Sequence, residues 1–405
     1  MNRSSKPTKA TSSGTRRPAV WMALSAPMAI TSPAANTAVG GVDKAKARDL
    51  GYEVDVVANG AEGEPGSHKD RYVMTRRADE VLHGLALAAR AVESREAIVF
   101  LKRSLAGPAA ALEAALGRMD LDGLEVSIHL GDESYVGGEE TALLESLEGR
   151  RAWPRPKPPR PAAVGLRGRP TLVQNVETLA RVPAAVADPE GFRARETTLV
   201  TLWGAVRRPG VYEVPLGTPL ARLVHDHGGG APDGIGMVFP GGPAGPPLGP
   251  DELDTPLDPE SLRDAGSALG TAALLVIDAA ACPLALAASV TAFFERENCG
   301  QCPPCAVGTA SLARIVQGVE EGGARPRDLG DLADVARFMS GHGYCAHCPA
   351  AARVATGLAK RFCAEVEAHL RHGGCPAASE RRPDPFAAGS PERRALETAV
   401  LEQLR

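Results

Sequence analysis

Apolar and polar positions follow two different rhythms, which divide the chain into an α/β part and a helical part. EVDVVA, ending at Ala58, is a short apolar run typical of a strand, and DEVLHGLALAARAV (79–92) has helical spacing. The same order of strand, glycine-containing loop and helix returns in SIHLGDESYVGGEETALLESL (127–147). Two such units at crossover spacing predict an α/β domain with a nucleotide site at the ends of its strands.

The last third of the chain has the pattern of a helical bundle. Apolar residues recur at helical spacing in four segments, which cover residues 284–298, 308–322, 328–343 and 350–374. Residues 376–394 are polar and rich in proline, which predicts a disordered tail, and ALETAVLEQLR (395–405) can form a short terminal helix.

Length, charge and hydropathy exclude several classes of protein. With 405 residues, the chain is long enough for about two to four domains. Apolar residues make up 44% and charged residues 23%, as in ordinary soluble proteins. The net charge of −4 gives no basic footprint for nucleic acid, and no apolar run has the length needed to span a bilayer. We therefore expect no nucleic-acid partner and no direct membrane span.

The cysteines indicate a metal site in a C-terminal domain, because none lies in the first 281 residues. NCGQCPPCAVGT places Cys299, Cys302 and Cys305 at intervals of three, so one short loop can offer three thiolates to one centre. A cubane iron–sulfur cluster takes three ligands from such a loop and the fourth from elsewhere, here from Cys345 or Cys348 in GYCAHC. A four-thiolate zinc site using Cys299, Cys302, Cys345 and Cys348 is the alternative.

Two glycine-rich loops are the candidate ligand sites of the α/β part. NGAEGEPG (59–66) follows the first predicted strand, and its glycines allow a close approach of backbone and ligand. Gly137 and Gly138 precede a predicted helix, whose N-terminus favours anions. Taken alone, Glu139 and Glu140 are better explained as solvated acids in the first turn of that helix.

The cysteine motif resembles that of a known family. NCGQCPPCAVGT is similar to the ESCGxCxPCRxGT motif of the flavoprotein F subunits of respiratory NADH:quinone oxidoreductase (complex I), which NAD-reducing hydrogenases and NAD-dependent formate dehydrogenases share. In that family the fourth cluster ligand lies forty residues after the third, as Cys345 lies after Cys305. The resemblance implies that Cys299, Cys302, Cys305 and Cys345 bind a 4Fe–4S cluster and that Cys348 is an additional thiol.

The resemblance extends upstream and covers about residues 52–372. ANGAEGEPGSHKDR (58–71) is similar to the family's CNADEGEPGTFKDR, and YVGGEETALLESLEGRRAWPRPKPPRPAAVGLRGRPTLVQNVETLARV (135–182) matches a long family segment almost without gaps. GVYEVPLGTPLARLV (210–224) resembles the family's β-grasp domain, called SLBB. The implied α/β multidomain fold is a Rossmann-like FMN-binding domain that is incomplete at its N-terminus, an SLBB domain, and a C-terminal helical bundle with the 4Fe–4S cluster.

By the same resemblance, hydride passes from NADH to FMN, and electrons pass singly from FMN to the cluster. The chemistry belongs to the cofactors, which the protein orients. Two carboxylates are implied at the flavin and nicotinamide, and they are Glu62 and Glu64. The implied cofactor-binding residues are Asn59, Gly60, Gly63, Tyr135, Gly138, Glu139, Glu140 and Asn175. The sequence therefore predicts an electron-input subunit of the NADH dehydrogenase type.

Several positions depart from the family pattern. Ala61 replaces an aspartate, His68 a phenylalanine, Gly137 a cysteine and Gln174 an asparagine. The family's GRGGAGFPTGxKW motif, which binds the FMN phosphate and the dinucleotide, has no counterpart in residues 1–51. We expect that the cluster is kept and that the flavin site is impaired, so enzymatic activity depends on whether FMN binds. The alternatives are a non-catalytic iron–sulfur electron-transfer subunit and a zinc-stabilised ligand-binding protein built on the β-grasp domain.

The predicted domains are a disordered leader (1–48), the FMN/NADH-binding α/β domain (49–195), the SLBB domain (196–280), the helical cluster domain (281–375) and a mostly disordered tail (376–405). The leader contains Arg16 and Arg17 before an apolar stretch, an order loosely like that of an export signal. The family resemblance instead implies a cytoplasmic protein, whose partners are a thioredoxin-like 2Fe–2S subunit and a larger redox complex. Cys282 and Cys375 receive no role, and Cys363 is expected to be a small buried hydrophobic residue.

Overall fold

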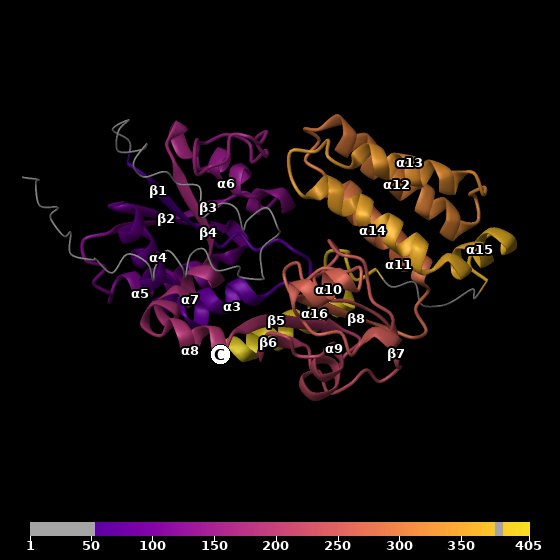
Figure 1. The fold of residues 1–405 in the computed structure, drawn as a ribbon, viewed down its shortest axis with the longest axis horizontal. Helices are drawn as coiled ribbons and strands as arrows, with labels where there is room; N and C mark the ends of the chain where they lie inside the picture. The colour runs from indigo at the N-terminus through magenta and orange to yellow at the C-terminus, as the bar shows by residue number, and fades with distance from the viewer. Residues whose placement is uncertain (1–52, 377–383) are drawn as a thin grey trace, which may run out of the picture.

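The computed structural model describes residues 53–376 and 384–405 (Figure 1). The predicted leader, with its arginine pair, lies outside these residues. The described chain has a parallel-sheet part (residues 53–195), a mixed-sheet part (196–280) and a helical part (281–375), and its last residues return to the mixed sheet. Within the described residues, no helix has the length and apolar character needed to cross a membrane.

The parallel-sheet part is built on four strands. They are β1 (Asp55–Asn59), β2 (Glu96–Lys102), β3 (Glu125–Gly131) and β4 (Thr171–Asn175), all parallel and in the order β3-β2-β1-β4. Successive side chains of β1 point to opposite faces, so Val56 and Ala58 join one core and Val57 joins the other. Because all four strands run in one direction, the loops that follow them meet at one edge of the sheet, where α/β proteins bind ligands.

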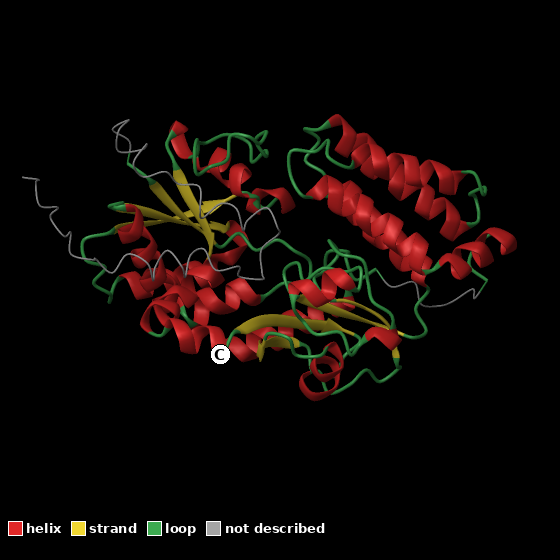
Figure 2. Cartoon of the chain, in the orientation of Figure 1, coloured by secondary structure: helices red, strands yellow, loops and turns green. Residues whose placement is uncertain are grey.

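Helices cover both faces of this sheet (Figure 2). On one face lie α4 (Ala78–Val92), α5 (Ala106–Leu116) and α7 (Val176–Ala187), and on the other lies α6 (Glu140–Leu147). The short helices α3 (Lys69–Arg76), η2 (Arg103–Leu105), η3 (Tyr135–Gly138), η4 (Leu166–Gly168) and α8 (Pro189–Ala194) complete the part. The predicted Rossmann-like α/β domain is confirmed.

The mixed-sheet part contains a second sheet of four strands. They are β5 (Thr197–Gly204), β6 (Gly210–Pro215), β7 (Ile235–Phe239) and β8 (Ala273–Asp278), in the order β6-β5-β8-β7. β5 pairs in parallel with β8, and the other two pairs are antiparallel. One face packs on its own short helices, α9 (Leu220–Arg222), η5 (Leu223–His227), η6 (Pro250–Glu252) and α10 (Pro259–Asp264), and the other face joins the main core of the molecule.

The helical part consists of α11 (Pro283–Arg296), α12 (Pro303–Glu321), α13 (Asp328–Met339), α14 (His347–Arg361) and α15 (Cys363–His372). Two details of the prediction are wrong. Helix α12 begins at Pro303 rather than at residue 308, because proline is well suited to the first helical position. The predicted helix 350–374 is two helices, because Phe362 leaves the helical conformation (φ −108°, ψ 40°) and packs against the core.

The prediction of a mostly disordered tail over 376–405 is wrong for residues 384–405. Helix α16 (Pro391–Leu404) packs against α3, β5 and β6, where it appears in yellow in Figure 1. Ser390 caps its N-terminus by accepting a hydrogen bond from the Arg393 backbone. Leu396 and Val400 lie four residues apart and are both buried, so this polar segment still has one apolar face. The predicted terminal helix is confirmed, with an earlier start.

Candidate functional site

Two cavities adjoin where the parallel-sheet part meets the helical part. The first has a volume of about 240 Å³ and is lined by the loop that follows β1, together with Lys102 and Tyr135. The second is lined by five cysteines and by Val136 and His347. Tyr135 and Val136 are consecutive residues of η3, so a single turn of backbone separates the cavities. The Tyr135 ring also lies edge-on to the His347 ring, with centroids 5.5 Å apart.

The loop that follows β1 is held against η3 by hydrogen bonds. The Asn59 side-chain amide donates to the Gly138 carbonyl oxygen (2.9 Å), and its Oδ1 accepts from the Ala61 backbone N–H (3.1 Å). Gly60 donates its backbone N–H to the Phe100 carbonyl oxygen. A Cβ atom at Gly138 would lie 2.6 Å from the Ala61 carbonyl oxygen, so glycine is required for this approach. Of the predicted cofactor-binding residues in these segments, Gly63 lines the cavity, whereas Asn59, Gly60 and Gly138 hold the loop in place and do not line it.

Glu62 lines the first cavity and also organises its floor. Its Oε1 accepts hydrogen bonds from the Ser67 hydroxyl (2.8 Å) and from the Asp70 backbone N–H (3.0 Å), and its Oε2 accepts from Arg71 Nε (3.0 Å). Burial by itself would raise the pKa of Glu62, but the positive charges of Arg71 and Lys69, and of His68 when it is protonated in acid, lower it to about 2. Glu62 is therefore a permanently ionised carboxylate that fixes the start of α3.

Glu64 also faces the first cavity, but its protonation near neutral pH differs from that of Glu62. The Tyr135 hydroxyl donates a hydrogen bond of 2.6 Å to Glu64 Oε2, while Oε1 is buried and has no hydrogen-bond partner among the described residues. Burial raises the pKa of Glu64 to about 7, against the opposing effect of the Tyr135 hydrogen bond. Burial likewise raises the pKa of Tyr135, so its hydroxyl remains a donor. Glu64 can therefore take up and release a proton near neutral pH.

Opposite effects on stability are expected when these two carboxylates are replaced by glutamine. The folded chain holds a proton on Glu64 that the unfolded chain, with a pKa near the usual 4.5, has lost, so stability falls as pH rises from about 4.5 to about 7. Glu64→Gln should remove this loss and stabilise the chain by about 3 kcal/mol at about pH 8. Glu62→Gln should lower the free energy of unfolding by about 3 kcal/mol at about pH 8. This destabilisation should become smaller only as the pH falls below about 4.5.

Thermal unfolding midpoints of the two variants at about pH 5 and about pH 8 provide the measurement. Shifts of the same sign for both substitutions at the higher pH would contradict the assigned protonation states.

Basic and orphaned polar groups surround the same cavity. Arg71, Lys102, Arg296 and Arg393 contribute positive charge to its lining. His68 is buried, and neither of its ring nitrogens has a hydrogen-bond partner among the described residues. Burial lowers the pKa of His68 to about 4, so the ring is neutral near pH 7. The sequence marked His68 only as a departure from the family, and its place in the cavity wall was missed.

A buried ionic network supports the cavity from below. Lys69 Nζ lies 2.6 Å from Asp70 Oδ1 and 3.1 Å from Glu177 Oε2, and both Lys69 and Glu177 are almost fully buried. Asn175, a predicted cofactor-binding residue, caps α7 through a hydrogen bond from the Glu177 backbone N–H (2.8 Å) and donates to Asp70 Oδ2 (2.9 Å). In this structure Asn175 therefore joins β4 and α7 to α3. Lys69 and Asp70 stand in the quoted SHKDR segment, but the sequence alone gave them no role.

Glu139 and Glu140 lie at the N-terminus of α6 and do not line the first cavity. Glu139 Oε2 accepts hydrogen bonds from the Thr141 and Ala142 backbone N–H groups (both 3.0 Å), which is the geometry of an N-cap. Lys157 forms ion pairs with both carboxylates. The described geometry thus agrees with the simpler interpretation, in which these acids stabilise a helix start.

The second cavity brings together the four predicted cluster ligands, Cys299, Cys302, Cys305 and Cys345, and the additional Cys348. Cys302 is the N-cap of α12, and Cys305 lies in its first turn, where the helix dipole favours a thiolate. Asn298 fixes the preceding loop, because its Oδ1 accepts from the Gly300 backbone N–H (2.7 Å) and its amide donates to the Thr309 hydroxyl (2.9 Å).

The spacing of the sulfur atoms separates the two kinds of metal centre that the sequence left open. Four thiolates around one zinc ion would lie about 3.8 Å apart, given Zn–S bonds of about 2.3 Å and tetrahedral angles. No three of the five cysteines in the described part of the chain have sulfur atoms that all lie within 4.8 Å of one another. Wider spacing suits a polynuclear cluster, in which each thiolate binds a different iron. By the spacing of their sulfur atoms, these cysteines therefore suit a cubane cluster better than a single zinc ion.

The remaining thiols differ in their surroundings. Burial raises the pKa of Cys345 to about 12, so this thiol needs the positive charge of a metal to ionise. Cys348 is fully buried, donates to the Met339 carbonyl oxygen (3.3 Å) and lies beside the Cys305 thiol. Cys363, expected to be buried, is exposed on α15, because this helix turns only Val366 and His369 fully inward. That prediction was wrong.

Comparison with family models agrees with this arrangement. Residues 42–184 match the Nuo51 FMN-binding domain, residues 199–243 the SLBB domain, and residues 285–369 the iron–sulfur binding region of NADH-ubiquinone oxidoreductase F. The three matches follow one another in the order of the parallel-sheet, mixed-sheet and helical parts.

Individual proteins are similar over most of the chain. The second F subunit of NADH-quinone oxidoreductase in Rhizobium meliloti is 38% identical over 339 residues, which cover 78% of this chain and 80% of that protein. The corresponding F subunit of Mycobacterium bovis is 39% identical over 343 residues, with coverage of 79% and 77%. A crystal structure of an air-oxidised NAD⁺-reducing [NiFe]-hydrogenase matches with a TM-score of 0.77 and 30% identity, over 96% of this chain and 66%, just under two thirds, of the hydrogenase chain.

The sequence identity, the coverage of the relatives and the succession of the three regions lead to one assignment. The chain belongs to the family of F subunits of NADH-quinone oxidoreductase, with an FMN-binding domain, an SLBB domain and a 4Fe–4S-binding region.

Proposed function

We propose that this chain is the electron-input subunit of a redox complex, which takes electrons from NADH through FMN to a 4Fe–4S cluster and on to a partner subunit. The adjoining cavities carry the proposal. Glu64 and Tyr135 face one cavity, and the next residue, Val136, faces the cysteines. A donor bound in the first cavity would therefore lie next to a cluster in the second.

The residues of the second cavity fit a 4Fe–4S cluster held by Cys299, Cys302, Cys305 and Cys345. Three of these thiols come from the loop before α12 and its first turn, and the fourth comes from the segment before α14. Because both segments border one cavity, a cluster bound there would lie between the helical part and η3. Cys348 would remain a thiol beside the cluster.

The polar groups of the first cavity fit a flavin and a nicotinamide cofactor. When bound, FMN accepts a hydride from NADH and releases electrons one at a time. Arg71, Lys102 and Arg393 would balance the phosphate charge, and the unpaired atoms of His68 and Glu64 would gain hydrogen-bond partners. Glu64, hydrogen-bonded to Tyr135, would hold or release a proton as the charge of the site changes.

A second function is favoured by the size of the first cavity. Its volume of about 240 Å³ is below the range of about 300 to 1,000 Å³ that is common for ligand sites. Phe386, Arg393 and Glu397 of the C-terminal segment form part of its wall. If this segment stays in place, the chain would hold the cluster without FMN and would act as a non-catalytic iron–sulfur electron-transfer subunit.

The cofactor content of the full chain, purified without oxygen, distinguishes the two functions. The electron-input proposal predicts four irons, four acid-labile sulfides and one FMN per chain. Four irons without FMN, even after incubation with excess FMN, would support the electron-transfer alternative. Zinc in place of iron in the cysteine cavity would contradict both functions.

We also propose the partners and the location. A thioredoxin-like 2Fe–2S subunit would accept electrons from the cluster within a larger complex, and the site of action would be the cytoplasm, where NADH is available. The names of the relatives support membership of an assembly, because those proteins are subunits of NADH-quinone oxidoreductases.

A further inference from the structure

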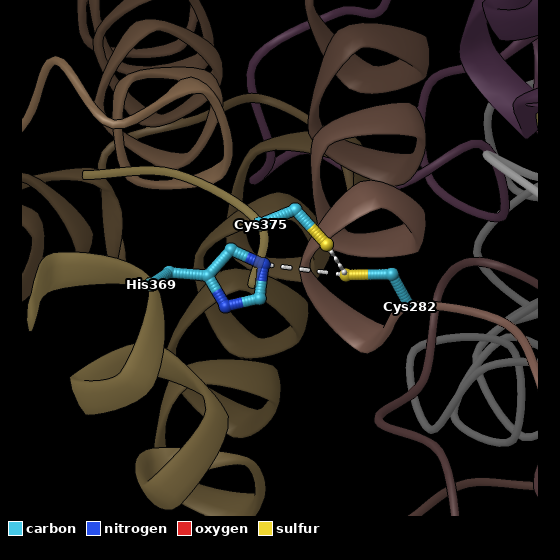
Figure 3. Close-up of side chains that lie close together, drawn as sticks. All are labelled: Cys282, His369 and Cys375. Atoms are coloured by element: carbon cyan, nitrogen blue, oxygen red, sulfur yellow. Dashed lines mark hydrogen bonds between the residues drawn. The ribbon is translucent and has the colours of Figure 1, made fainter. Parts of the chain in front are cut away.

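A second group of potential metal ligands lies away from the cysteine cavity. Figure 3 shows that the side chains of Cys282, His369 and Cys375 converge. Within the described residues, this is the one group of three or more His, Cys, Asp or Glu side chains whose ligand atoms all lie within 4.8 Å of one another. The three residues come from the segment before α11, from α15 and from the segment after α15.

The distances in this group match those around a single tetrahedral metal ion. Zn–S bonds of about 2.3 Å and Zn–N bonds of about 2.0 to 2.1 Å place two sulfurs about 3.8 Å apart and a sulfur and a nitrogen about 3.6 Å apart. The observed distances are 3.8 Å between the Cys282 and Cys375 sulfurs and 3.4 Å from Cys282 Sγ to His369 Nε2. The sulfur separation is far longer than the bond of about 2.05 Å in a disulfide.

The histidine is held with its metal-binding nitrogen directed at the sulfur of Cys282. His369 Nδ1 lies 2.7 Å from the Glu365 carbonyl oxygen, which can only accept a hydrogen bond. Nδ1 must therefore carry a proton, and the lone pair of the neutral ring is on Nε2. A backbone carbonyl that fixes the tautomer in this way is the usual support of a metal-binding histidine.

Cys282 lies at the N-terminus of a helix, where the helix dipole favours a negatively charged ligand. Cys282 is the N-cap of α11, a helix of 14 residues. His369 is 3% exposed and Cys282 8%, whereas Cys375 is half-buried, so the group is open to solvent only on the side of Cys375.

We propose that Cys282, His369 and Cys375 bind one Zn²⁺ ion, with water or a small solute in the fourth position. Binding converts both thiols to thiolates and releases two protons, while His369 binds as the neutral ring, so no oxidant or reductant is involved. Two thiolates and one imidazole form a ligand set that zinc uses in proteins with an open fourth position.

The site would act as a structural clamp on α15. This helix buries only Val366 and His369, and it packs at the end of the bundle near the start of α11. The cysteine cavity adjoins the other end of α11, about 21 Å away for 14 helical residues. Zinc would thus hold α15 to the junction between the mixed-sheet and helical parts without touching the cluster.

Metal analysis of the full-length chain with its iron–sulfur cluster tests this proposal. The wild type should contain one zinc per chain besides its iron, and His369→Gln and Cys375→Ser should lose the zinc and keep the iron. Cys363→Ser is the matched control, because Cys363 is exposed on the same helix and should leave both metals unchanged. After zinc removal, Co²⁺ should give a tetrahedral thiolate spectrum in the wild type and in the control, and this spectrum should be lost or weakened in the two variants.

Two results would overturn the proposal. One is an iron-loaded wild-type chain that takes up neither zinc nor cobalt, including the case in which Cys282 and Cys375 are isolated as a disulfide and bind no metal after reduction. The other is metal uptake that is the same in His369→Gln, Cys375→Ser and the wild type. Faster hydrogen exchange over residues 363–375 on zinc removal would support the clamp, and unchanged exchange there would contradict it.

Discussion

Replacing Cys305 with alanine should abolish the iron–sulfur cluster, with iron content falling from four per chain to nearly none. Each iron of a cubane needs one terminal ligand, and Cys305 presents its thiol from the first turn of α12 into the cavity. The same loss is expected for alanine at Cys299, Cys302 and Cys345. Iron and acid-labile sulfide, measured on protein purified without oxygen, provide the test.

Cys348→Ala is the matched control for this experiment. Cys348 lines the same cavity, but its thiol donates to the Met339 carbonyl oxygen and is fully buried, so its loss should leave the iron content unchanged. Loss of iron in Cys348→Ala together with full iron in Cys345→Ala would assign the fourth ligand to Cys348 instead. Circular dichroism of each variant distinguishes loss of the cluster from loss of the fold.

Lys69→Met should destabilise the chain by about 3 to 5 kcal/mol. The Lys69 ammonium lies between the carboxylates of Asp70 and Glu177, at 2.6 and 3.1 Å, and it is 3% exposed. These ionic contacts raise the pKa of Lys69 in spite of its burial. Removing the cation leaves the buried Asp70 carboxylate without its counter-charge and leaves Glu177 with Arg181 as its ion-pair partner, and breaking a buried ion pair from one side has a cost of this size.

The surface pair Arg118–Asp79 provides the comparison. Both side chains are more than half exposed, so Arg118→Met should change the free energy of unfolding by less than about 1 kcal/mol. Chemical denaturation of both variants with the cofactors removed gives the two values. If Lys69→Met changes the free energy of unfolding as little as Arg118→Met does, the Lys69 network does not support the cavity floor.

Most of the fold could be predicted from the sequence, because the patterns that indicate each helix or strand lie within that element. The apolar run at Val56 to Ala58 and the helical spacing of 79–92 each lie within one element, and the structure has a strand and a helix there. The cysteine loop before α12 was readable for the same reason, and the family resemblance supplied Cys345. The break at Phe362 and the packing of α16 depend on contacts with distant parts of the chain, so periodicity alone missed them.

The candidate site could be predicted only in part from the sequence, because the role of a side chain depends on which residues lie near it in the folded chain. Asn59, Glu139 and Asn175 were expected to contact a cofactor, and here they hold loops and cap helices. Cys282 and His369 are 87 residues apart, and Cys282 and Cys375 are 93 apart, so no motif could have joined them. Such convergence appears only once the helices are packed.

The most direct test of the account is to add NADH, without oxygen, to the full chain loaded with its cluster and FMN, and to follow the cluster by electron paramagnetic resonance. The account predicts that NADH reduces the cluster as dithionite does, and that chain prepared without FMN responds to dithionite but not to NADH. A cluster that dithionite reduces while NADH leaves it oxidised, with FMN bound, would contradict the proposed path of electrons between the two cavities.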